Sequence, residues 1–134
     1  MARRIACVAM TAAAISLMIG QGQAVAQSLP SRPGRCALTT ITDIGYRLVD
    51  SRTGKGIPGS GSAVSFANGG YQVSYDEVSA VTKSRKGDRV YMCLMLIPSN
   101  CPTGDNRGRE YTTTNLRTME SWTLPDSEHG CGGA

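Results

Sequence analysis

The chain has 134 residues, of which 18% are charged and 5% aromatic, and a formal net charge of +4. A charge of this size is too small to indicate a polyanion-binding protein by itself. The length is that of a single domain of ordinary size.

The first 26 residues have the pattern of a secretory signal peptide. Arg3 and Arg4 form a basic start, residues 5–20 are largely apolar, and Ala24-Val25-Ala26 fits a signal peptidase site. A membrane-spanning helix is the alternative, but the apolar run is shorter than the roughly 20 residues that a bilayer requires. We therefore predict cleavage after Ala26, a periplasmic or extracellular location, and no transmembrane segment in the remaining chain.

Two regions follow the leader. Residues 27–35 are polar and contain two prolines, which predicts a flexible N-terminal arm. Residues 36–134 are expected to form a single disulfide-stapled β domain. Its first segment, residues 37–49, is rich in β-branched residues without helical periodicity and predicts a strand that ends in a turn at 50–56.

A β-hairpin is predicted next. Residues 63–67 and 71–75 flank Asn68-Gly69-Gly70, a strong turn signal. Val64 and Phe66 alternate with small residues, and Ser74 separates Val73 from Tyr75, so each strand is expected to have one solvated face.

The segment 76–85 is ambiguous. Asp76 can cap a short helix that runs to about Ser84, or the segment can return as an irregular strand through a turn at 85–88. Residues 89–97 are apolar at most positions, which predicts a central strand buried on both faces.

The rest of the chain adds a long loop at 98–109 and two strands, 111–116 and 121–124, joined by a turn at 117–120. About seven or eight short strands, with turn signals every ten residues or so, predict an all-β fold. The expected architecture is a small antiparallel sandwich or barrel, with one short helix if the helical alternative at 76–85 holds.

One sequence pattern occurs twice. Tyr46-x-x-x-Asp50-x-Arg52-Thr53 matches Tyr111-x-x-x-Asn115-x-Arg117-Thr118. A duplication would explain the match, but the flanking residues differ. We prefer two hairpins that use the same turn chemistry, with the Asp or Asn side chain opening the turn.

Four cysteines remain after removal of the leader, which carries Cys7. Cys36, Cys93, Cys101 and Cys131 predict two disulfides, with three possible pairings. A zinc site is the alternative, but its cysteines usually lie two to four residues apart, closer than any pair here. An intact strand places Cys93 about 13 Å from the strand end, too far for a local bridge to Cys101. The favoured pairing is Cys36–Cys93 with Cys101–Cys131.

The C-terminal residues raise the question of a metal or catalytic cluster. Asp126, Glu128, His129 and Cys131 lie together, but His129 is the only histidine of the chain. Metal sites usually recruit several such ligands, and a disulfide-bonded Cys131 is neither ligand nor nucleophile. We interpret the tail as a polar turn pinned by Cys131, and we predict no metal.

No cofactor site is predicted either. Residues 54–59 match the letters of the dinucleotide fingerprint, but Pro58 and a Gly/Ser run follow where the fingerprint needs a helix.

A basic cluster lies between the predicted hairpin and the central strand. Lys83, Arg85, Lys86 and Arg89 can contact an anionic partner, such as a lipid or lipopolysaccharide head group or an acidic protein. The alternative is a solvated turn that protects a strand edge. No aromatic residue interleaves with these cations, so nucleic acid is not an expected partner.

The loop at residues 101–110 is the second candidate surface. It carries Arg107, Arg109 and Glu110, and a stapled loop on a β scaffold suits partner recognition. A plain crossover is the alternative. If the disulfide brings loop and tail together, Asp105 or Glu110 could form an acid/base pair with Asp126 or Glu128.

Motifs of the second half carry a family resemblance: GDRV, CL, CP, GDNRG, NLRT, SWTLPDS, His129 and CGGA. Together they resemble small exported bacterial proteins of no established function. The resemblance spans residues 36–134 and implies export and a cysteine-stapled domain, without an activity.

The functional hypothesis is therefore an exported binding or accessory domain, either an enzyme inhibitor or an envelope-associated protein. Its partner would be an unidentified protein or envelope component. The alternatives are a small carboxylate-dependent hydrolase and a binder of anionic membrane surfaces.

Overall fold

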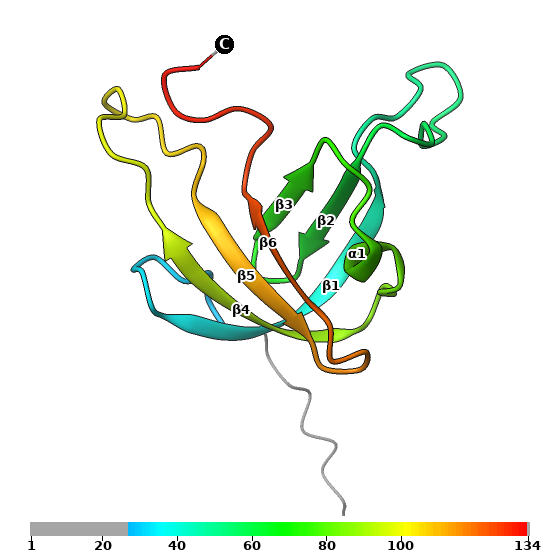
Figure 1. The fold of residues 1–134 in the computed structure, drawn as a ribbon, viewed down its shortest axis with the longest axis horizontal. Coiled ribbons are helices and arrows are strands. Elements are labelled where there is room, and N and C mark those ends of the chain that lie inside the picture. Colours follow the sequence, from blue (N-terminus) through cyan, green and yellow to red (C-terminus); the bar gives the residue numbers. More distant parts are fainter. Residues whose placement is uncertain (1–26, 134) are drawn as a thin grey trace, which may run out of the picture.

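The computed structural model describes residues 27–133. The predicted leader, with Arg3, Arg4, Cys7 and the cleavage site after Ala26, lies outside the described residues. Six antiparallel strands form a curled sheet with the shape of a half-barrel, and one short helix packs against it (Figure 1). In chain order the elements are β1 (Cys36–Tyr46), β2 (Ser62–Phe66), β3 (Tyr71–Ser74), α1 (Ser79–Thr82), β4 (Arg89–Leu96), β5 (Glu110–Asn115) and β6 (Ser121–Pro125).

The predicted all-β class is confirmed, with fewer strands than the seven or eight expected. Residues 47–61 form a long loop that contains only a single bridge, between Val49 and Gly56. The ambiguous segment forms α1, so its helical alternative is correct. Its expected cap is wrong, because Val78 occupies the N-cap position and no side chain caps the helix. The buried Val81 anchors α1 to the core instead.

The strand β1 belongs to both halves of the sheet, whose order is β3-β2-β1-β4-β5-β6. Residues 36–40 pair with β4, whereas residues from Ile41 onward pair with β2. An irregularity between Ile41 and Asp43 separates the two registers. A second irregularity lies in β4, between Leu94 and Leu96. Because such bulges bend a strand and increase its twist, both contribute to the curl of the sheet.

Alternation along the strands builds the core on the concave face. Val90, Met92 and Leu94 of β4 are completely buried among large side chains from β1, β2, β5 and β6. The central position of β4 is confirmed, but its predicted burial on both faces is wrong. Tyr91 is 47% exposed and Met95 is 53% exposed, because the described residues form a single sheet and leave its outer face uncovered.

The two edge strands of the sheet, β3 and β6, approach each other, and we call the region between them the seam. The buried side chain of Gln72 bridges the seam. The Nε2 atom of Gln72 donates to the carbonyls of Tyr111 (2.6 Å) and Leu124 (3.1 Å). Its Oε1 atom accepts from Thr113 Oγ1 (2.7 Å) and Trp122 Nε1 (2.9 Å). All four hydrogen bonds of this amide are therefore made inside the protein.

The expected solvated face of β3 is not observed. Gln72 and Val73 point to opposite faces, yet both are buried. Gln72 faces the core, whereas Val73 lies near Leu124 and Pro125 at the end of β6. The approach of β6 therefore covers a strand that the sequence pattern places at the surface. The hairpin of β2 and β3 and its turn are as predicted.

Residues 27–35, the predicted flexible arm, contact the sheet at several points. Leu29 packs against the core, and the carbonyl of Pro30 accepts a hydrogen bond from the Tyr111 hydroxyl (3.3 Å). The amide of Gly34 donates to the carbonyl of Leu94 (2.8 Å).

The two copies of the repeated sequence pattern form turns with the same side-chain hydrogen bonds. The predicted turn chemistry is therefore present in both, as a duplication would also produce. Asp50 Oδ1 accepts from the amides of Arg52 (2.8 Å) and Thr53 (3.0 Å). In the second turn, Asn115 Oδ1 accepts from the amides two and three residues on, at 2.8 and 3.3 Å. We call residues 50–54 the first Asx turn and residues 115–119 the second.

The fifth residue of each turn has a positive φ, +69° at Gly54 and +59° at Met119. Glycine adopts this left-handed conformation without strain, whereas a methionine there costs free energy. The side chain of Met119 is 73% exposed, the most of any large hydrophobic residue in the described part.

Both predicted disulfides are present. Cys36 and Cys93 lie opposite each other on β1 and β4, and their bond joins the two strands on the outer face of the sheet. Cys101 and Cys131 join the loop after β4 to the C-terminal tail. Within residues 27–133, no helix has the length and apolar character needed to cross a membrane.

Candidate functional site

The residues singled out in the sequence gather at the two ends of strand β5 (Figure 1). At its start, residues 98–109 and 125–133 form one surface, here called the loop–tail platform. At its far end, the second Asx turn meets the turn between α1 and β4, and this region is here called the basic end. A strand of six residues spans about 20 Å, so the two regions are separate surfaces.

Hydrogen bonds to the Asp126 side chain connect the two segments of the loop–tail platform. Its Oδ1 atom accepts from the amides of Gly108 (2.8 Å) and Arg109 (3.1 Å). The neighbouring Ser127 hydroxyl also accepts from the Gly108 amide (2.9 Å) and donates to the carbonyl of His129 (2.7 Å). The tail thus satisfies backbone donors of a loop that has no regular secondary structure.

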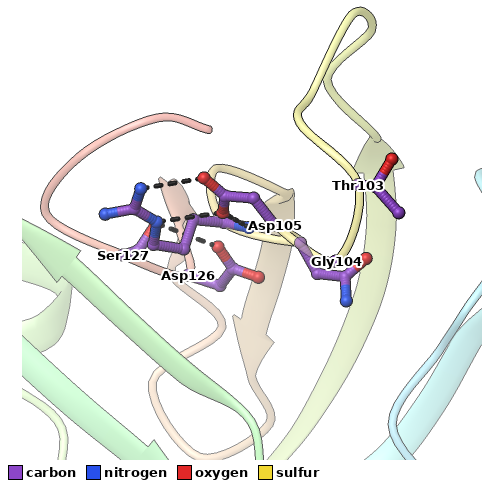
Figure 2. A pocket seen from close by; sticks show the side chains of 7 residues that line it. Thr103, Gly104, Asp105, Asp126 and Ser127 are labelled. Carbon is purple, nitrogen blue, oxygen red and sulfur yellow. Dashed lines mark hydrogen bonds and ion pairs between the residues drawn. The ribbon is translucent and has the colours of Figure 1, made fainter. Parts of the chain in front are cut away.

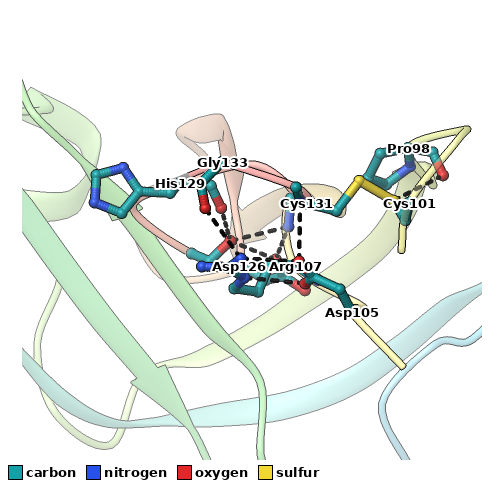
Figure 3. A network of polar contacts seen from close by, with 11 residues as sticks. Pro98, Cys101, Asp105, Arg107, Asp126, His129, Cys131 and Gly133 are labelled. Atoms are coloured by element: carbon teal, nitrogen blue, oxygen red, sulfur yellow. Dashed lines mark hydrogen bonds and ion pairs between the residues drawn. A yellow bond between two sulfur atoms is a disulfide. The ribbon is translucent and has the colours of Figure 1, made fainter. Parts of the chain in front are cut away.

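Asp105 and Arg107 make a second link (Figure 3). Arg107 donates from Nε (3.0 Å) and Nη2 (2.8 Å) to the Asp105 carboxylate, which also accepts from the amide of Gly132 (3.0 Å). Arg107 Nη2 reaches the carbonyl of Gly133 at 3.2 Å. The Arg107 guanidinium and the Gly132 amide hold the pKa of Asp105 well below its usual range, so its carboxylate is ionised at neutral pH.

A hollow of about 620 Å³ opens on this surface between the loop and residues 126–127 (Figure 2). Thr103, Asn106 and Ser127 are among the residues that line it, together with Asp105 and Asp126. The disulfide therefore does bring carboxylates of loop and tail to one hollow. Both carboxylates are engaged by Arg107 or by backbone amides, which favours a structural role for them over acid/base chemistry.

The remaining two carboxylates of the hydrolase hypothesis lie outside this hollow. Glu110 is exposed at the start of β5, and Glu128 pairs with Arg47 at 3.4 Å. Arg47 also donates from Nε to the carbonyl of Ser60 (2.7 Å) and lies 4.3 Å from the ring centroid of Tyr75. The sequence gives no signal for this contact, because Arg47 and Glu128 are distant along the chain.

His129 is exposed, and its imidazole points away from the polar network of the loop–tail platform (Figure 3). Arg109 is partly buried at the base of the platform, and its Nη2 lies 3.4 Å from Asn106 Oδ1. The described part of the chain holds no group of three or more side chains placed to bind a metal ion.

The basic end contains an ion pair between a buried carboxylate and an exposed guanidinium, which the sequence does not reveal. Arg117 donates from Nε (2.7 Å) and Nη2 (2.8 Å) to the Asp88 carboxylate. Asp88 also accepts from Asn115 Nδ2 and from the amide of Arg85, both at 2.8 Å. These contacts, chiefly those from Arg117, hold the pKa of Asp88 well below its ordinary value. The repeated pattern marks Arg117 as a turn residue but carries no information about its partner.

The four predicted cations all lie at this end. Lys83 pairs with Glu120 at 2.7 Å, whereas Arg85, Lys86 and Arg89 are exposed and have no carboxylate within ion-pair distance among residues 27–133. Edge protection does not explain them, because β4 is paired on both sides.

The lowered pKa of Asp88 predicts that the folded protein loses stability in acid. Because its pKa is lower in the folded chain than in the unfolded chain, its stabilising contribution is complete above about pH 4 and is lost as the pH falls further. We expect Asp88→Asn to lower the melting temperature at pH 7 by about 5–10 °C. The variant should also lose less of its remaining stability than the wild type between pH 5 and pH 2.

Melting curves across this pH range, followed by circular dichroism, check the prediction. Asp76→Asn, at an exposed carboxylate before α1, is the matched control and should leave the pH profile unchanged. An Asp88→Asn profile parallel to that of the wild type would contradict the assignment.

Comparison of the chain with protein-family models, with curated proteins and with solved structures found no match in any of the three.

Proposed function

We propose that the protein is an exported binding domain that presents the loop–tail platform to a protein or an envelope component. The observation that carries the proposal is the joint fixation of two irregular segments. The Cys101–Cys131 disulfide, the Asp126 hydrogen bonds and the Asp105–Arg107 pair hold them as one surface.

Rigid display of irregular segments is a feature of binding surfaces. Loops on a stable β scaffold carry recognition in many proteins, and fixing them before binding reduces the entropy lost in the complex. Thr103, Asn106 and His129 are exposed on this platform. The hollow beside them is open and is lined mostly by polar and charged residues. An open shape suits the surface of a macromolecule better than an enclosed small ligand.

Two disulfides are compatible with an oxidising compartment, where such bonds form and persist. The leader pattern and the resemblance to small exported bacterial proteins support the same location. A platform that depends on a disulfide for its shape would function in the periplasm or outside the cell.

The test is affinity capture from an envelope extract, with the purified protein as bait. The platform variant Thr103→Arg/His129→Glu changes two exposed side chains without removing a side-chain hydrogen bond of the network. The control variant Ser51→Arg places a similar bulk on the exposed first Asx turn. We expect one partner to be retained by the wild type and the control and lost by the platform variant. Identical capture by all three proteins would refute the platform as the binding surface.

A further inference from the structure

A second surface, the basic end, combines positive charge with exposed apolar side chains. The cations there are Lys83, Arg85, Lys86, Arg89 and Arg117. Contacts between the turns hold them close together: the amide of Leu116 donates to the carbonyl of Arg89 (3.0 Å), and Arg117 Nη2 reaches the carbonyl of Lys83 (2.9 Å).

Two exposed large hydrophobic residues belong to the same end of the molecule. Leu116 is 41% exposed and Met119 is 73% exposed, and both belong to the second Asx turn. The first Asx turn has a glycine where the second has Met119. The chain therefore keeps an exposed methionine in a strained backbone conformation that glycine would adopt freely, and such strain often marks a functional position.

We infer that the basic end docks onto the surface of an anionic phospholipid bilayer, with Met119 inserted among the lipid chains. Arg85, Lys86 and Arg89 supply charge complementarity to the head groups, because no carboxylate of residues 27–133 neutralises them. An exposed methionine gains by transfer to hydrocarbon, which a soluble polyanion does not offer. The combination of both features favours a membrane over a polyanion.

The distribution of unpaired cations supports a defined orientation. At the loop–tail platform, near the start of β5, Asp105 pairs with Arg107 and Glu128 pairs with Arg47. Beyond the end of β5, Arg85, Lys86 and Arg89 have no carboxylate within ion-pair distance among residues 27–133. Attraction of these cations would turn the platform away from a negatively charged surface. The inference is independent of the proposed function, which concerns the platform alone.

Vesicle sedimentation tests the inference with the purified protein. The vesicles contain equal parts of phosphatidylglycerol and phosphatidylcholine, and pure phosphatidylcholine vesicles form the comparison. We expect binding to the anionic vesicles only, weakened by moderate salt. Each cation near such a surface contributes roughly fivefold to partitioning, so Arg85→Gln/Lys86→Gln should reduce it about thirtyfold.

The variant Met119→Gly distinguishes a role of Met119 in vesicle binding from a role in the stability of the fold. Glycine relieves the left-handed strain, so the melting temperature should stay constant or rise, while loss of the side chain reduces vesicle binding about tenfold. A merely structural role of Met119 would not produce this opposite pair of effects.

The charge-matched control is Arg52→Gln/Lys55→Gln, which removes two exposed cations at the first Asx turn. It should retain vesicle binding. Equal binding to pure phosphatidylcholine, equal loss in the control, or full binding by either basic-end variant would overturn the inference. Binding of heparin at least as tight as binding of vesicles, unaffected by Met119→Gly, would also overturn it and assign the surface to a soluble polyanion.

Discussion

Gln72→Leu is expected to lower the free energy of unfolding by about 4 kcal/mol. The substitution leaves the Thr113 hydroxyl, the Trp122 indole N–H and two carbonyls of the seam without the amide that now satisfies them. Each buried polar group left unpaired costs about 1–3 kcal/mol, although such costs do not add fully. A domain of this size has about 5–15 kcal/mol in total, so the loss should be evident.

Urea unfolding followed by the fluorescence of Trp122, the only tryptophan of the chain, measures this loss. Gln27→Leu is the matched control, because Gln27 Oε1 accepts from the Leu38 amide at an exposed position, and it should cost less than about 1 kcal/mol. Adding Thr113→Val to Gln72→Leu should recover part of the loss, since it removes an orphaned hydroxyl. A Gln72→Leu loss below about 1 kcal/mol would contradict the role of Gln72 at the seam.

Removal of the disulfide at the loop–tail platform is expected to cause the second large loss of stability. Cys101 and Cys131 are 30 residues apart in the sequence. On the chain-entropy model, a bond that closes a ring of this length stabilises the fold by about 3–4 kcal/mol, chiefly by restricting the unfolded chain. The double variant Cys101→Ser/Cys131→Ser should therefore lose about that amount in the same urea assay.

His129→Ala is the companion variant, placed two residues from Cys131. Its side chain is exposed and takes no part in the network, so the change in stability should stay below about 0.5 kcal/mol. A serine variant as stable as the wild type would show that the tail does not depend on the staple. Loss of a measurable activity in a fully stable His129→Ala protein would instead indicate a chemical site in the tail.

The fold was predictable where local pattern and local structure agree. Asn68-Gly69-Gly70 specifies its hairpin because the required backbone conformations are those of glycine-rich turns. The two Asx turns were predictable for the same reason, since each depends on one side chain and its own neighbouring amides. The extended geometry of a single strand argued against a local Cys93–Cys101 bridge, and the structure contains the favoured one of the two remaining pairings.

Features that depend on distant parts of the chain were not predictable. Gln72 is a polar residue in an edge strand, a position that usually faces water, and only the approach of β6 buries it. The outer face of β4 contains the opposite case, since Tyr91 and Met95 are exposed because residues 27–133 form no second layer over them. The candidate surfaces likewise combine features that are local in the sequence with features that only folding brings together. The sequence indicated the cationic run, but Arg117 and Met119 join it only through the folding of a separate hairpin.

The dual pairing of β1 has a consequence for the order of events during synthesis. The edge of β1 that pairs with β4 has no partner until residues 89–96 have been synthesised. Cys93, the disulfide partner of Cys36, follows it by 57 residues. At typical translation rates of 5–20 residues per second, this delay is about 3–11 s. During that interval the nascent chain carries an unpaired, β-prone edge, which is a hazard for aggregation. A chain truncated before β4 would therefore keep this edge unpaired and would need a chaperone or a protease.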